Sequence, residues 1–197
     1  PIDNRQNKLM QMKAEVKQVM ELCDQFYKLF GISYHIELST RPEKSVGSDE
    51  MWQLAETTMQ DITKELGMEI KINPGDGAFY GPKFDFHIAD CIGRTWQCGT
   101  VQLDFSMPER FDLEYIGEDG KKHRPVMIHR VIFGSLERFI GILIEHFAGA
   151  FPSWLAPVQI RLVPVSEKHL DYARELAASL KDFRVEVDES EESVGKK

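Results

Sequence analysis

The chain has 197 residues, 42% hydrophobic and 28% charged, which is enough for one ordinary hydrophobic core and a smaller second unit. With 24 basic and 32 acidic residues the formal net charge is −8, so the chain as a whole does not attract nucleic acid. No apolar run could span a bilayer, the N-terminus does not resemble a secretory leader, and three cysteines without Cys-x-x-Cys spacing favour a reducing compartment. We therefore expect a globular, cytoplasmic protein without membrane contact.

The first third of the chain predicts two amphipathic helices separated by a strand. Apolar residues recur near every 3.6 positions over residues 8–30, and residues 33–39 alternate as a strand does. A second helix is predicted over residues 49–66, with Ser48 or Asp49 as its N-cap and Gly67 at its end.

A series of strands follows. Residues 69–73 are predicted to be a short strand, residues 84–90 alternate strictly, and residues 95–105 are predicted to return along them through a hairpin. Further extended pieces are expected at residues 111–116 and 126–133. These segments predict an α+β fold, in which one antiparallel sheet of about five strands is flanked by helices.

The stretch from residue 127 to 147 predicts a buried strand that leads into a long core helix. The break lies at Gly134 and Ser135, and Ser135 is the predicted N-cap. Arg138 would then lie in the first helical turn, where a planar guanidinium can meet a phosphate or stack on a flat base. The alternative is that Glu137 and Arg138 are simply solvated residues of an amphipathic helix.

Two prolines, Pro152 and Pro157, mark a boundary. Beyond it a strand at 158–165, a helix at 167–180 and a strand at 184–188 predict a βαβ unit with parallel pairing. The sequence stops after these few elements, so we expect this unit to be cut short.

Three clusters are candidates for chemistry. The first is the turn at residues 79–83, where Gly81 and Pro82 hold the Tyr80 hydroxyl and the Lys83 ammonium close together. An ordinary turn with a core aromatic residue would have the same pattern.

The second cluster is the strand at residues 95–105. In a regular strand Thr100, Gln102 and Asp104 share one face, and polar groups on a covered face need partners. Gly99 suggests either a bulge or the close approach of a ligand, and a bulge would bring Gln97 to the same side. The alternative is that this face is wet.

The third candidate is His129, a lone histidine in an apolar strand. Such a residue is more often a satisfied core histidine than a metal ligand, because zinc needs three or four donors. No ligand-spaced set forms with it from His87, Cys91, Cys98 or His123.

Several of these segments together resemble the threonyl-tRNA synthetase family of class II aminoacyl-tRNA synthetases, from about residue 13 to the end of the chain. They are residues 37–43, 47–52, 77–83, 96–105, 125–130 and, as the third class II signature motif, 134–138. The resemblance implies that residues 1–156 are the C-terminal part of the class II catalytic domain. Residues 157–197 would begin the α/β anticodon-binding domain.

The resemblance also implies roles for individual residues. Tyr80, Lys83, Thr100 and Gln102 would bind the amino-acid substrate and its adenylate, and Gln97 and Arg138 would bind ATP, which carries Mg²⁺. His129 would be one of three ligands of a zinc ion that reads the threonine hydroxyl. The implied enzyme is a homodimer that activates L-threonine with ATP and transfers it to tRNA(Thr), through positioning and without a protein nucleophile.

Some family features are absent from the sequence. These are the first and second signature motifs and the cysteine and histidine that would complete the zinc site. We therefore expect the chain to be a fragment that does not form threonyl-adenylate at a useful rate alone. Two alternatives stay open: a non-catalytic binding module that reuses the synthetase scaffold, and a piece with no function of its own.

Overall fold

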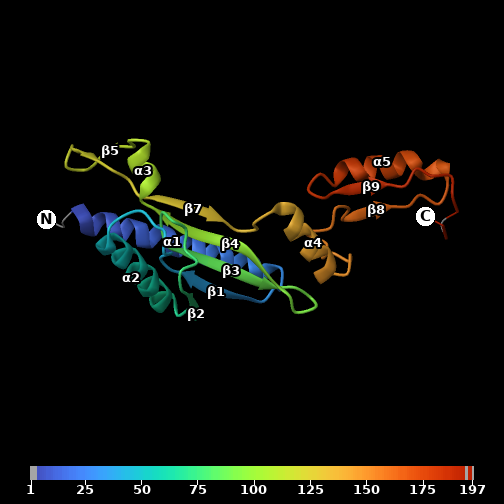
Figure 1. Cartoon of the computed structure of the whole chain (residues 1–197). Coiled ribbons are helices and arrows are strands. Elements are labelled where there is room, and N and C mark those ends of the chain that lie inside the picture. Colours follow the sequence, from blue (N-terminus) through green and yellow to red (C-terminus); the bar gives the residue numbers. More distant parts are fainter. Residues whose placement is uncertain (1–3, 194, 197) are drawn as a thin grey trace. The chain divides into compact units, whose positions relative to one another are not determined.

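The computed structural model describes residues 4–193 and 195–196, and the chain divides into two compact units between Ile142 and Leu143. Residues 1–3, where the first predicted domain begins, and residues 194 and 197 of the second lie outside the described residues. The first unit contains α1 (Asn4–Leu29), β1 (Tyr34–Ser39), α2 (Asp49–Leu66), β2 (Ile70–Asn73), β3 (Lys83–Ala89), β4 (Thr95–Asp104), α3 (Ser106–Arg110), β5 (Tyr115–Ile116), β6 (Lys122–His123) and β7 (Met127–Val131) (Figure 1). Helix α4 (Leu136–His146) runs across the division.

The first unit is built on a five-stranded sheet in the order β2-β1-β3-β4-β7. The predicted α+β class is confirmed. The sheet departs from the antiparallel expectation at one edge, because β2 pairs in parallel with β1. Helix α2 lies between these two strands in the sequence, and such a crossover returns the chain in the same direction.

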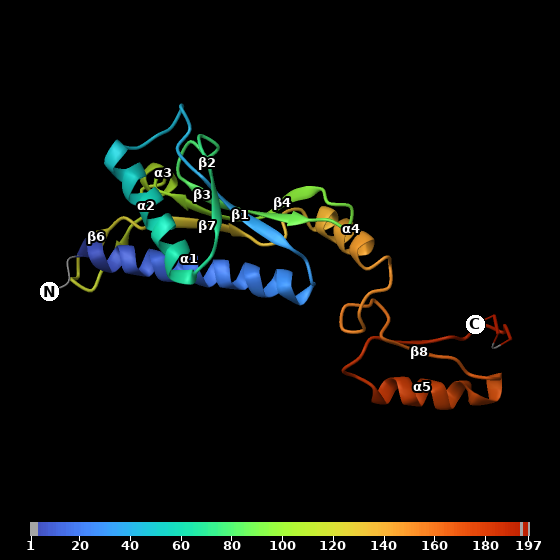
Figure 2. The same cartoon turned by 90° about the horizontal axis from the view of Figure 1, so that it is seen from below.

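Helices α1 and α2 cover one face of this sheet (Figures 1 and 2). They bury apolar side chains that include Val16, Met20, Trp52, Met59 and Ile62. The sheet contributes side chains that alternate along β3 and β4: Phe84, Phe86, Ile88, Val101 and Leu103. The intervening side chains of the same strands therefore lie on the opposite face.

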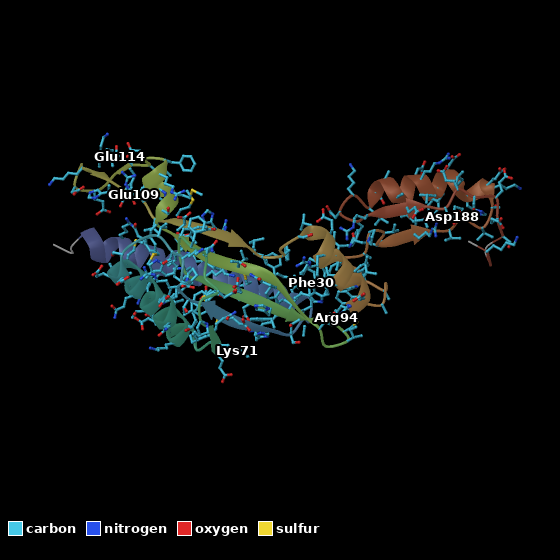
Figure 3. All side chains as sticks on the ribbon, viewed as in Figure 1. Phe30, Lys71, Arg94, Glu109, Glu114 and Asp188 are labelled. Carbon is cyan, nitrogen blue, oxygen red and sulfur yellow. The ribbon has the colours of Figure 1, made fainter. Side chains whose placement is uncertain are left out.

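Local signals explain both ends of α2 and the start of α3. Ser48 caps α2 by accepting a hydrogen bond from the backbone N–H of Met51, and Gly67 ends that helix with φ 64°, as predicted. The short helix α3, which carries Glu109 (Figure 3), follows β4 directly. It forms because the Asp104 carboxylate accepts the backbone N–H groups of Ser106 and Met107.

The second unit contains β8 (Ile160–Leu162), the 3₁₀ helix η1 (Glu167–His169), α5 (Leu170–Ser179) and β9 (Val185–Val187). Strands β8 and β9 pair in parallel, which confirms the predicted βαβ unit. Asp188, labelled after β9 in Figure 3, accepts hydrogen bonds from the backbone N–H and the hydroxyl of Ser190. Within the described residues, no helix combines the length and apolar character needed to cross a membrane.

Gly99 is required by close packing on the helix-covered face. A Cβ at this position would lie 2.5 Å from Tyr27 Oη and 3.1 Å from Phe86 Cβ, and Tyr27 is fully buried. We expect Gly99→Ala to lower the free energy of unfolding of the first unit by about 1–3 kcal/mol, the usual cost of overpacking. Hydrogen exchange of the β3 and β4 amides measures this stability locally.

Gly141→Ala is the matched control, because a Cβ at Gly141 meets no atom within 4 Å. Alanine there should stabilise helix α4 by about 0.5–1 kcal/mol. Equal protection of the β4 amides in the Gly99→Ala variant and the unchanged chain would contradict the packing argument.

Candidate functional site

The candidate site lies on the sheet face opposite helices α1 and α2. The register places Asp85 beside Thr100, and Gln102 between Lys83 and His129, across β3, β4 and β7. Side chains of register partners point to the same side, so polar groups from three strands form one continuous surface.

A β-bulge in β4 adds Gln97 to this surface. Gly99 pairs with Phe86 but Gln97 pairs with His87, so Cys98 is the extra residue. The predicted bulge is therefore present, and Gln97 Nε2 lies 3.3 Å from Thr100 Oγ1. The close approach at Gly99 is made by the protein's own Tyr27 on the opposite face.

Asp85 is the charged centre of the surface and is only 1% exposed. Its Oδ1 accepts hydrogen bonds from Gln97 Nε2 at 2.5 Å and Thr100 Oγ1 at 3.0 Å. Its Oδ2 accepts from Ser39 Oγ at 2.9 Å and lies 2.7 Å from Lys83 Nζ. The carboxylate thus has the partners that a buried charge requires.

Tyr80 closes one side of the surface. Its hydroxyl donates to Gln102 Oε1 at 2.8 Å, which confirms that the turn and strand β4 meet. Burial, and next the negative charge of Asp104, raise the pKa of Tyr80, while Lys83 opposes the shift. The hydroxyl therefore remains a hydrogen-bond donor throughout the physiological pH range.

The position of Tyr80 depends on Gly81, which packs directly on the backbone of β4. A Cβ at Gly81 would lie 1.9 Å from the carbonyl oxygen of Leu103, so alanine must displace the turn. We expect Gly81→Ala to break the bond between Tyr80 and Gln102. The Tyr80 pKa should then fall back toward its ordinary value of about 10, because the ring moves into solvent.

A pH titration of ¹³Cζ-labelled tyrosine by NMR measures this shift, and Tyr80→Phe assigns the resonance. Gly141→Ala again serves as the control that leaves the turn in place. An unchanged Tyr80 titration in Gly81→Ala would show that the turn does not depend on the close contact.

His129 lies at the other side of the surface, next to Gln102. Its Nε2 is 2.8 Å from Asp104 Oδ2, and its ring meets the ring of Tyr80 edge-on at 5.9 Å. Asp104 is fully buried, whereas the His129 side chain is 43% exposed. The Asp104 carboxylate holds Nε2, so Nδ1 is the ring nitrogen that this contact does not use.

The described residues do not form a complete metal site. They contain no group of three or more His, Cys, Asp or Glu side chains placed to hold a metal ion. His129 alone does not supply the three or four donors that zinc takes.

Arg138 lies at the start of α4, where the backbone N–H of Arg138 donates to Ser135 Oγ at 3.3 Å. The predicted N-cap is therefore confirmed. The guanidinium lies 5.6 Å from the centre of the Trp96 ring, and Arg94, at the tip of the β3–β4 hairpin (Figure 3), contacts the same ring at 5.3 Å.

Asp90 fixes Trp96 in this arrangement by accepting its indole N–H at 2.9 Å. Burial alone would raise the pKa of the Asp90 carboxyl, but hydrogen bonds from Trp96 and Arg94 outweigh burial and hold the pKa below its usual range. The Arg138 guanidinium therefore lies over an aromatic ring that Asp90 holds in place.

The structure thus gathers six of the seven predicted residues into two groups of three on one sheet face. Lys83, Gln97 and Thr100 meet at Asp85, while Tyr80 contacts both Gln102 and His129. Arg138 instead contacts Trp96.

Two acidic residues that connect the site, Asp85 and Asp104, were not predicted as site residues. The alternation of Asp85 with Phe84 and Phe86 was the available signal for the first. For Asp104, its place on one strand face with Thr100 and Gln102 was the signal.

Parts of both units match known families. Residues 6–147 match the family described as the tRNA synthetase class II core domain (G, H, P, S and T). Residues 159–197 match the family described as the anticodon binding domain.

Curated relatives are similar across nearly the whole chain. The threonine–tRNA ligases of Carboxydothermus hydrogenoformans and Desulforamulus reducens are both 62% identical over 189 residues, which is 95% of this chain. The chain spans about 30% of the length of each of these relatives.

Two solved structures are similar as well. The RNA binding domain of threonyl-tRNA synthetase from Cryptosporidium parvum Iowa II aligns with a TM-score of 0.87 and 39% identity, over 95% of this chain and 48% of that one. A putative threonyl-tRNA synthetase from Aeropyrum pernix aligns with a TM-score of 0.72 and 30% identity, over 91% and 44%.

Proposed function

The chain belongs to the class II tRNA synthetase core-domain family, and from this premise we propose that it forms part of a threonine–tRNA ligase. Such an enzyme activates L-threonine with ATP and transfers it to tRNA(Thr). The observation that carries the proposal is the contact of Tyr80 with both Gln102 and His129 on one sheet face. The 62% identity to threonine–tRNA ligases supports it.

In this proposal the polar surface binds threonine and its adenylate. Tyr80, Thr100 and Gln102 line the amino-acid pocket, and Lys83 lies toward the adenylate. Hydroxyl and amide groups with fixed partners suit a small polar substrate, because they cost little reorganisation when the substrate binds.

His129 is proposed as one zinc ligand. Asp104 holds its Nε2, so Nδ1 would be the donor atom. Zinc bound there would take the threonine hydroxyl as a ligand and so reject valine, which has the same shape but no hydroxyl. A purely apolar pocket distinguishes these two amino acids poorly. The remaining donors would come from outside the described residues.

Gln97 and Arg138 are proposed to bind ATP with its Mg²⁺. The Arg138 guanidinium already lies over one aromatic ring, Trp96, and its planar face suits stacking on adenine. In the reaction, a threonine carboxylate oxygen attacks the α-phosphorus and pyrophosphate leaves. A terminal ribose hydroxyl of the tRNA then attacks the carbonyl carbon and AMP leaves.

The same proposal extends to the rest of the chain. Residues 1–156 would belong to the catalytic domain and residues 157–197 to the anticodon-binding domain. We place the enzyme in the cytoplasm as a homodimer, and the free thiols of Cys23, Cys91 and Cys98 agree with a reducing compartment.

A chimera tests this proposal. The 189-residue segment of the Carboxydothermus ligase that matches this chain is replaced by the corresponding residues of this chain; we call this protein the chimera. We expect it to catalyse threonine-dependent exchange of pyrophosphate into ATP within about tenfold of the unaltered relative, because chemistry of this kind depends on positioning. A folded chimera without exchange would overturn the proposal.

A further inference from the structure

Asp85 is one of two buried carboxylates on the polar surface of the first unit, the other being Asp104. It contacts more of the proposed site residues than any other side chain described above. It lies on β3 between Phe84 and Phe86, which point into the helix-covered core, so its carboxylate points to the other face. At 1% exposure it has no direct route to a bound substrate. Any effect on chemistry must therefore pass through its partners.

Three of its four partners are residues assigned to substrates. Gln97 and Thr100 donate to Oδ1, and Lys83 is paired with Oδ2. The fourth, Ser39, donates to Oδ2 and completes the set. A carboxylate is an acceptor only, so each of these groups must direct a proton toward Asp85.

The direction of these hydrogen bonds determines whether Gln97 and Thr100 can donate to a ligand or accept from it. The Gln97 amide nitrogen donates one N–H to Asp85 and the other to Thr100 Oγ1 at 3.3 Å, which leaves its carbonyl oxygen to accept. The Thr100 proton is committed as well, so its oxygen can only accept further hydrogen bonds. A substrate group at this point must therefore be a donor, such as the α-ammonium of an amino acid.

We propose that Asp85 is a positioning residue that sets the hydrogen-bond direction of Gln97 and Thr100 and the location of Lys83 for binding of threonine and ATP. The inference rests on the proposed function. A purely structural ion pair between Asp85 and Lys83 would predict loss of stability alone.

Asp85→Asn in the chimera distinguishes the positioning role from a purely structural ion pair. The substitution keeps the shape but turns one acceptor into a donor, so Gln97 or Lys83 must lose its partner. We expect kcat/KM for threonine in pyrophosphate exchange to fall about 100-fold, the typical effect of misplacing site groups by about 1 Å.

Asp24→Asn is the matched control. Asp24 also accepts from a lysine, Lys28, at 2.7 Å, and from the Tyr34 hydroxyl at 2.5 Å. Tyr34 contacts Phe86 on the helix-covered face, away from the polar surface. This variant should lower the melting temperature while leaving kcat/KM within about twofold of the chimera, as expected for a distant site.

A double-mutant cycle distinguishes positioning from a purely structural role, because it measures whether the effect of Asp85→Asn on kcat/KM depends on Gln97 and Thr100. In a chimera that carries Gln97→Ala and Thr100→Val, Asp85→Asn should cost less than about tenfold, because two of its three targets are already gone. If Asp85→Asn folds poorly because Lys83 is left without its carboxylate, the same cycle is run in a Lys83→Met background, which removes the uncompensated charge.

Two results would overturn the inference. One is an unchanged kcat/KM in folded Asp85→Asn. The other is a fall in kcat/KM on Asp85→Asn that is as large in the Gln97→Ala, Thr100→Val background as in the chimera. An inactive chimera with Asp85 intact would instead overturn the proposed function, and this inference with it.

Discussion

His129→Ala in the chimera is expected to lower the preference for threonine over valine by about 100- to 1,000-fold. The reason is that a site that binds a substrate hydroxyl rejects the analogue lacking it by about 10⁴–10⁵, whereas an apolar pocket reaches only about 10². Valine-dependent and threonine-dependent pyrophosphate exchange, measured side by side as kcat/KM, give the ratio. Zinc content of the same samples should fall together with the preference.

His123→Ala is the matched control for this prediction. His123 Nε2 lies 2.9 Å from Asp119 Oδ1, so it forms the same kind of histidine–carboxylate pair on β6, outside the polar surface. Its loss should leave both zinc content and amino-acid preference unchanged. Retention of the threonine preference in His129→Ala would remove His129 from the recognition of the hydroxyl.

Arg138→Ala is expected to raise the KM for ATP about 10- to 100-fold while changing the KM for threonine by less than about threefold. The estimate follows from the stacking of a base on a planar side chain, which contributes about 1–3 kcal/mol. Arg138→Lys should recover little of this loss, because an ammonium keeps the charge without the planar face.

Arg94→Ala controls for the effect of removing a guanidinium from Trp96. Arg94 contacts the same ring, at 5.3 Å, but it belongs to the hairpin and is not assigned to ATP. We expect its removal to leave the KM for ATP within about twofold of the chimera. Equal losses in the two variants would mean that Arg138 acts by holding Trp96, and would contradict the assignment to ATP.

The parts of the fold that depend on local pattern were predictable from the sequence. The limits of α2 followed from Ser48 and Gly67, and the bulge that carries Gln97 followed from Gly99 within a strand. These features depend on neighbouring residues, so a short window of sequence contains the information.

The burial of Asp85 could not be predicted in this way. Its face of the sheet is covered by the turn that precedes β3, where the Gly77 N–H donates to the Thr40 carbonyl and Ser39 Oγ reaches Asp76 at 3.4 Å. Each of these two contacts joins residues 37 positions apart. The alternation of Phe84, Asp85 and Phe86 was equally consistent with a wet outer face.

The contact of His129 with Asp104 could not be predicted from the sequence for a related reason. Asp104 is 25 residues away, and the two side chains meet because β4 and β7 pair with Gln102 opposite His129. The sequence contains both residues but does not contain the register. A one-residue slip would place them on opposite faces of the sheet.

Calorimetric titration of the chimera with a non-hydrolysable threonyl-adenylate analogue, and in parallel with its valyl counterpart, tests the central claim most directly. We predict stoichiometric zinc in the protein and binding of the threonyl analogue at least about 100-fold tighter than that of the valyl analogue. Equal affinity for the two analogues, or no binding of either by a folded chimera, would contradict the assignment of the polar surface to threonine.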